Sequence, residues 1–184
     1  MNGSKVIGAN YFNLGESNSS SDSMSPADDA GHGTHTSSIA AGVAVKGASL
    51  YGVGKGTARG GVPSARLAMY KVCWVSGCSD MDMLAGFDQA IADGVNFISV
   101  SIGGPAHDFL TDPVAIGAFH AMARGILTSC SAGNSGPRPM SVENVAPWIL
   151  TVAASSTDRQ FITVAAIGDG KNATVSMIVS CVCG

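Results

Sequence analysis

The sequence predicts an α/β fold in which a parallel β-sheet is flanked by helices. Four short apolar runs are separated by stretches with helical periodicity, and they lie at residues 66–73, 96–102, 126–132 and 148–154. Alternation of this kind indicates a parallel sheet. The 184 residues are 46% hydrophobic and only 12% charged, which suits a single tightly packed core.

The first element is a short strand over residues 5–12, followed by a loop rich in Ser, Asn and Asp over residues 13–29. A helix then begins at His32 and continues through very small side chains to Gly42. Such side chains predict a helix that packs deep in the protein, with its backbone close to neighbouring elements.

His32 lies between two glycines where this helix begins, so it is a candidate general base. The positive end of the helix dipole disfavours imidazolium and favours the neutral form, which can accept a proton. Two alternatives stay open from these residues alone. His32 and His35 are polar residues of a helix start without a chemical role, or they bind a metal with Asp28 and Asp29, although their spacing lacks the pattern of known zinc motifs.

The glycine-rich stretch over residues 42–61 fits neither of the two phosphate-binding patterns. Gly54-Lys55-Gly56 has Gly where a P-loop needs Ser or Thr, and no strand directly precedes the glycines. The stretch therefore predicts a flexible connection across the surface.

Two helices are predicted between the later strands. The first opens with Ser79 and Asp82 in capping-box order and ends at Gly94. The second begins at Asp112-Pro113 and ends at Gly125. The helical spacing of Met81, Met83 and Met122 predicts core packing rather than a binding surface.

The composition excludes several function classes. A net charge of −3 gives no electrostatic reason to expect nucleic acid as a partner. No apolar run approaches the roughly 20 residues that span a bilayer, and the first residues lack the apolar stretch of a signal peptide. Five cysteines leave at least one unpaired within the chain, so counting does not fix the compartment. No cofactor site is predicted, and the oligomeric state is not encoded in any pattern.

Ligands of open α/β sheets gather beyond the carboxyl ends of the strands. Two glycine-bearing turns occupy such positions, at residues 101–105 and 131–137. These turns are the predicted ligand-binding edge of the sheet.

Three motifs, in this order and spacing, resemble those of the subtilisin-like serine proteases, peptidase family S8. They are Gly31-His32-Gly33-Thr34-His35, Gly103-Gly104-Pro105 and Ala132-Gly133-Asn134-Ser135-Gly136-Pro137. Within the family the chain resembles the plant, cucumisin-type branch, through Tyr70-Lys71-Val72-Cys73-Trp74, Ala118-Phe119-His120-Ala121-Met122 and Pro147-Trp148. The resemblance implies a partial subtilisin-like peptidase domain over residues 1–170, with a divergent tail at 171–184.

The resemblance also implies roles for single residues. His32 matches the catalytic base, Asn134 matches the side-chain donor to the oxyanion, and His35 matches a structural histidine. The turn Ser101-Ile102-Gly103-Gly104 resembles the segment that pairs with substrate backbone, and Ala132-Gly133 resembles one wall of the P1 pocket.

A peptide or protein substrate, no cofactor and an extracellular location follow from the same resemblance. If the protein is secreted as plant subtilases are, Cys73 and Cys78 should form a disulfide.

The sequence departs from the family at the other two members of its catalytic triad. No segment before His32 resembles the aspartate strand, and Asp22, Asp28 and Asp29 are expected to have loop or capping roles. No Gly-Thr-Ser-Met sequence marks a nucleophile, and Ser135 and Ser176 do not replace it. We therefore expect an internal fragment of the catalytic domain. Two functions follow. The family implies a serine endopeptidase, and the alternative is a non-catalytic chain that binds peptides through residues 101–104. For these 184 residues alone we expect the non-catalytic alternative.

Overall fold

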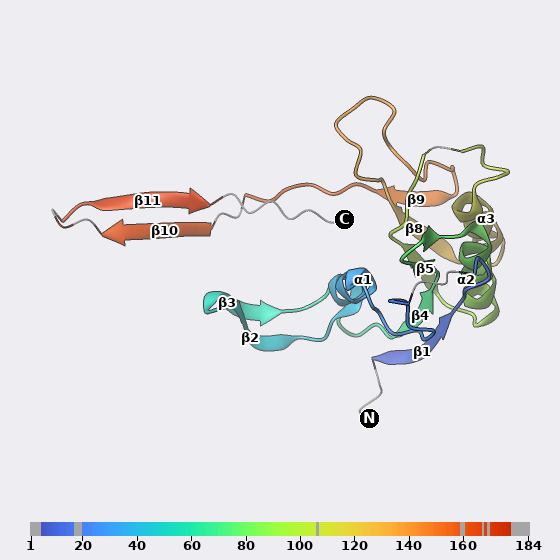
Figure 1. Ribbon diagram of the computed structural model, residues 1–184, viewed down its shortest axis with the longest axis horizontal. Coiled ribbons are helices and arrows are strands. Elements are labelled where there is room, and N and C mark those ends of the chain that lie inside the picture. Colours follow the sequence, from blue (N-terminus) through green and yellow to red (C-terminus); the bar gives the residue numbers. More distant parts are fainter. Residues whose placement is uncertain are drawn as a thin grey trace. The chain divides into compact units, whose positions relative to one another are not determined.

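The computed structural model describes residues 5–16, 20–105, 107–158, 161–166, 168 and 170–177. The chain divides into two compact units, Met1–Ala153 and Ala154–Gly184. The first unit contains the helices and most of the strands, and the second contains a single antiparallel hairpin (Figure 1).

The first unit confirms the predicted α/β class and its parallel strands. Three parallel strands lie in the order β7, β8, β9, and their bounds are Phe97–Val100, Leu127–Ser131 and Ile149–Val152. A second parallel pair consists of β1 (Val6–Tyr11) and β4 (Leu67–Lys71). Among the described residues the two groups form separate sheets, so the predicted parallel sheet is divided.

The two helices predicted between the later strands are confirmed as α2 (Asp80–Ala92) and α3 (Pro113–Ala123). The Ser79 hydroxyl accepts a hydrogen bond from the Asp82 amide at 3.1 Å, which is one half of a capping box. The Asp82 carboxylate does not complete the box, because it accepts from the Leu14 amide instead. At the start of α3 the Asp112 carboxylate caps the amides of Val114 and Ala115.

A buried cluster lies between α2, α3 and β8. It consists of Met83, Phe87, Val114, Ala118 and Cys130. A Cβ added to Gly117 would overlap the Phe87 ring, so the missing side chain lets α3 approach α2 closely. Figure 1 shows the two helices side by side next to the sheet. The core thus packs against the strands whose carboxyl ends form the predicted ligand-binding edge.

Of the three methionines predicted in the core, only Met83 is buried. Met81 is 55% exposed and Met122 is 44% exposed, so core packing was wrong for both. Residues two positions apart on a helix point to nearly opposite sides, which separates Met81 from Met83. Met122 directly follows Ala121 of the buried face and turns away from it by about 100°.

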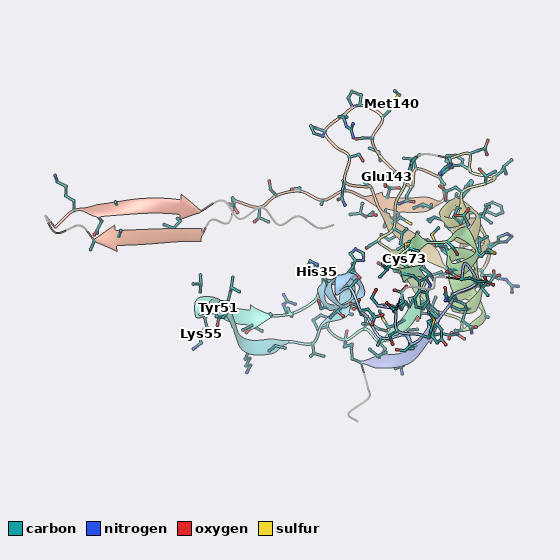
Figure 2. The ribbon with its side chains drawn as sticks, in the orientation of Figure 1. His35, Tyr51, Lys55, Cys73, Met140 and Glu143 are labelled. Carbon is teal, nitrogen blue, oxygen red and sulfur yellow. A yellow bond between two sulfur atoms is a disulfide. The ribbon has the colours of Figure 1, made fainter. Side chains whose placement is uncertain are left out.

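The glycine-rich stretch is a β-hairpin, so the predicted flexible connection was wrong. Its antiparallel strands are β2 (Val45–Leu50) and β3 (Val53–Ala58). Tyr51 and Gly52 connect them with positive φ angles of 50° and 89°. Two consecutive positive φ values are the geometry of the tight turn whose twist matches that of paired strands. Figure 2 labels Tyr51 and Lys55 on this hairpin.

The helix predicted from His32 is confirmed as α1 (His32–Ala41), but its predicted deep burial was wrong. Only Ala41 of its ten residues is buried. The small residues serve a close backbone approach instead: the amides of Gly60, Gly61 and Val62 donate to the carbonyl groups of Gly42, Ile39 and Ala40 at 2.8 to 2.9 Å.

Two short hairpins complete the described chain. β5 (Cys73–Trp74) pairs with β6 (Gly77–Cys78) in the first unit. In the second unit β10 (Phe161–Ala166) pairs with β11 (Asn172–Met177). The structure contains, in the part of the chain it describes, no helix of the length and apolarity that a bilayer span requires.

Candidate active site

The candidate base lies in the helix start, which we define as residues 28–35. Gly31 precedes His32 with a φ of 87°, a left-handed conformation that glycine adopts without strain. The Gly31 carbonyl then accepts the first helical hydrogen bond, from the His35 amide at 3.0 Å. His32 and His35 are both exposed, and Figure 2 shows His35 on α1.

Asp28 holds the helix start in this geometry. One of its oxygens accepts from the amides of Ala30 (3.0 Å) and Gly31 (2.8 Å), and the other accepts from the Thr34 amide (2.7 Å) and hydroxyl (2.6 Å). The hydrogen bonds from Thr34, and then those from Gly31 and Ala30, lower the pKa of Asp28 to about 2. Asp28 therefore caps α1 and fixes the backbone on both sides of His32.

The other two acidic residues of the polar loop also have structural partners, as predicted. Asp29 forms an ion pair with Lys71 at 2.6 Å, and the hydrogen bond from Lys71 lowers its pKa. Asp22 accepts a hydrogen bond from the Val75 amide at 3.0 Å. The loop or capping roles expected for Asp22, Asp28 and Asp29 are confirmed by these contacts.

The predicted substrate-binding residues lie in the strand edge, which we define as residues 101–104 after β7 and 131–134 at the end of β8. Val100 lies opposite Cys130 in the parallel register, so both strands end at the same level. The carboxyl ends of parallel strands share one side of a sheet. Ser101, Ile102, Gly103 and Gly104 are thereby brought beside Ala132 and Gly133.

Asn144 ties the two segments of the strand edge together. Its side-chain amide donates to the carbonyl oxygens of Ile102 and Ser131, both at 2.9 Å. Asn144 has a φ of 55°, which asparagine tolerates better than most residues. Sequence reasoning missed this role. The available signal was weak, because one asparagine in a loop gives no indication of two carbonyl groups that lie 42 and 13 positions away.

Gly133 and Asn134 follow β8 in a turn. Gly133 has a φ of 84° and directly precedes the exposed Asn134. A Cβ added to Gly133 would lie 2.5 Å from Glu143 Cδ and 2.7 Å from both of its carboxylate oxygens. Glycine is thus required at this position by conformation and by space. Glu143 is a second residue beside the strand edge that sequence reasoning missed.

The cysteines divide into a bonded pair and a buried thiol. Cys73 and Cys78 form a disulfide with a Cα separation of 4.1 Å. Cys130 is free, and burial, with a smaller contribution from the charge of Asp112, raises the pKa of its thiol to about 12. A thiol with so high a pKa is a poor nucleophile. Cys181 and Cys183 lie outside the described residues.

Comparison with known proteins gives concordant findings. The sequence model of the subtilase family matches residues 7–180. The chain is 62% identical to Subtilisin-like protease SBT4.15 of Arabidopsis thaliana over 171 residues, which are 92% of this chain and 22% of that protein. It is 57% identical to Subtilisin-like protease SBT1.7 of the same plant over 176 residues, 92% of this chain and 23% of that protein. The chain thus spans about a fifth of the length of these curated relatives.

Among solved structures, S41 Psychrophilic Protease matches with a TM-score of 0.61 at 26% identity. The match covers 94% of this chain and 51% of that one.

Proposed function

The chain belongs to the subtilase family, and from that premise we propose that it supplies the base, the oxyanion donor and part of the substrate-binding surface of a serine endopeptidase. The observation that carries the proposal is the strand edge, where Asn144 joins the carbonyl groups of Ile102 and Ser131. This tie holds residues 101–104 beside the turn that contains Asn134. The proposed substrates are peptides and proteins.

In the proposed reaction a serine hydroxyl attacks the scissile carbonyl carbon while His32 accepts the hydroxyl proton. The carbonyl oxygen becomes an oxyanion, to which the Asn134 side chain donates a hydrogen bond. His32 then gives its proton to the leaving amine as the peptide bond breaks, which leaves the acyl group on the serine. Water next attacks the acyl carbonyl carbon while His32 accepts a proton from it, and His32 returns that proton to the serine oxygen as the acid product leaves. Backbone groups of residues 101–104 hold the substrate as an added strand.

We assign Asp28 a positioning role in this scheme, because it orients the helix start without reaching the substrate. Its bonds to Gly31 and Thr34 lie on either side of His32. An extracellular location is also proposed, and the Cys73–Cys78 disulfide supports it because such bonds persist in oxidising compartments.

A second candidate function is a non-catalytic chain that binds peptides at the strand edge. The observation that favours it is that these 184 residues contain no Gly-Thr-Ser-Met motif and no aspartate motif before His32. Under this alternative the 184-residue chain, purified alone, neither hydrolyses peptides nor reacts with a fluorophosphonate. Labelling of a serine by that reagent would exclude the alternative.

The decisive experiment places residues 7–180 in SBT4.15 in exchange for the matching segment and measures hydrolysis of fluorogenic peptides. His32→Ala should lower kcat by roughly 10⁶, the size of loss that removal of the base causes in subtilisin. His35→Ala is the matched control from the same helix. It should alter stability and leave the kcat of folded enzyme near the unsubstituted value. Equal losses for both variants would refute the assignment of His32 as the base.

The same chimera tests the oxyanion donor. Asn134→Ala should lower kcat by about 10²–10³ with little change in KM, the size of loss that removal of such a donor causes in subtilisin. A rise in KM at constant kcat would show that Asn134 binds the substrate ground state instead.

A further inference from the structure

We propose that Glu143 makes the P1 pocket acidic, so that the enzyme prefers peptides with lysine or arginine before the cleaved bond. This inference rests on the proposed function, because it assigns the substrate class of the same site. It goes further by naming the side chain that selects the substrate.

The backbone of Glu143 is fixed to the strand edge. Its amide donates to the Ala132 carbonyl at 3.0 Å, and the next residue, Asn144, binds the carbonyl groups of Ile102 and Ser131. Residues 143 and 144 therefore cross both segments of the edge. Figure 2 labels Glu143 on the loop between Met140 and β9.

The carboxylate of Glu143 lies against both walls of the proposed pocket. A Cβ added to Gly103 would overlap Oε2, and one added to Gly133 would lie 2.7 Å from Oε1 and from Oε2. The absence of side chains at these two positions is what leaves room for the carboxylate. Gly103 belongs to the predicted substrate segment and Gly133 to the predicted pocket wall, so the negative charge lies between the two surfaces that a P1 side chain would touch.

No positive charge of the described chain neutralises Glu143. The residue is partly buried, and the ion pair recorded among the described residues joins Lys71 to Asp29. The structure records no hydrogen bond to the Glu143 carboxylate within the same described ranges. Partial removal of a carboxylate from water is unfavourable unless a cation or donors compensate it.

A bound lysine or arginine side chain would supply that compensation. Its long aliphatic stem can lie along apolar surface while its charged end reaches the carboxylate. An acidic side chain in the P1 pocket gives trypsin its preference for basic residues by the same physics. A neutral side chain of equal length leaves the carboxylate uncompensated, and an acidic one adds repulsion.

The test uses the chimera with SBT4.15 and peptides that differ only at P1, which is lysine, norleucine, alanine or glutamate. Norleucine resembles lysine in length but lacks the charge. We expect kcat/KM for lysine to exceed that for norleucine by about 10-fold to 100-fold, the range of a hydrogen bond to a charged group. Glutamate should be the poorest substrate.

Glu143→Gln removes the charge and keeps the size of the side chain. It should bring the ratio of kcat/KM for the lysine peptide to kcat/KM for the norleucine peptide close to one, by lowering only kcat/KM for the lysine peptide. Asp88→Asn is the matched control, because it removes a negative charge from an exposed position on α2. This control should leave the ratio unchanged, whereas an equal drop would mean that net charge, not the pocket, causes the preference.

The outcomes separate this inference from the proposed function. Hydrolysis of no peptide would overturn the proposed function and this inference with it. Hydrolysis in which norleucine equals or exceeds lysine would overturn the inference alone. A preference for alanine would do the same, because it would show that the carboxylate fills the pocket. The peptide series needs no variant, so the inference is tested even if Glu143→Gln does not fold.

Discussion

The strand edge is backed by a buried core, whereas the helix start is held chiefly by one exposed carboxylate. Cys130 of β8 belongs to the cluster around Phe87, and the edge begins one residue later. The helix start depends on Asp28, and only Ala41 of α1 is buried. The proposed oxyanion half of the site is thus stabilised by hydrophobic burial, and the proposed base half by local hydrogen bonds. Different perturbations should separate the two.

The largest effect is expected from Phe87→Ala, which removes a side chain that is 6% exposed from the core behind the strand edge. The free energy of unfolding should fall by about 3–5 kcal/mol, through lost burial and the cavity that remains. Urea unfolding of the 184-residue chain, followed by tryptophan fluorescence, measures this loss.

Phe97→Ala is the matched control, because Phe97 is 49% exposed on β7. It should lower the free energy of unfolding by well under half as much as Phe87→Ala does. Similar losses for both variants would show that the cluster around Phe87 does not dominate the stability of the edge.

A smaller effect is expected when the Cys73–Cys78 disulfide is replaced by two serines. The disulfide joins residues 5 positions apart, and closure of so short a loop contributes about 2 kcal/mol. Trp74 lies in the same hairpin, with the Lys71 ammonium 4.6 Å from its ring centroid. The loss should therefore increase amide exchange near the Lys71–Asp29 ion pair and leave exchange in β8 unchanged. Equal increases in amide exchange near the ion pair and in β8 would show that the helix start and the strand edge are not stabilised independently.

Asp28→Ala should cost about 0.5–2 kcal/mol, the range for loss of a helix cap. Its effect should be confined to the helix start, where the Gly31 and Thr34 amides lose their acceptor and exchange faster. Asp29→Ala is the control from the adjacent position. It removes the ion pair with Lys71 and should leave the exchange of Thr34 unchanged.

Acid should loosen the helix start by protonating Asp28. The pKa of Asp28 is about 2 in the folded chain and near 3.8 without its partners. Because the folded value is the lower one, the stabilisation by Asp28 is complete above pH 3.8 and is lost as the pH falls towards 2. The NMR shift of the Thr34 amide should titrate with a midpoint near 2. A midpoint near 3.8 would mean that the hydrogen bonds to Asp28 are weak in solution.

Cys130 offers the gentlest probe of the edge, because it requires no substitution. With a thiol pKa of about 12 and 2% exposure, it should resist iodoacetamide at pH 8 in the folded chain and react in urea. Peptide mapping after timed labelling measures this protection. Rapid alkylation without denaturant would show that the core behind β8 opens readily.

The sequence by itself determined the elements whose causes are local. Ser79 and Asp112 start the two helices because each caps an amide two or three positions ahead. Gly94 and Gly125 follow the helix ends with φ values of 69° and 74°, which glycine adopts freely. The apolar runs indicated the parallel strands, because each run is a local pattern. The order of the short motifs indicated the family.

Only the tertiary structure decided how the strand edge is assembled. Glu143 meets Gly103 and Gly133 because the parallel register of β7 and β8 sets their ends level, and no local pattern encodes a contact across 40 positions. The exposure of α1 was misjudged for a related reason. Small residues indicate that something approaches closely, but only the folded chain shows that residues 60–62 approach the end of α1 while most residues of the helix stay exposed.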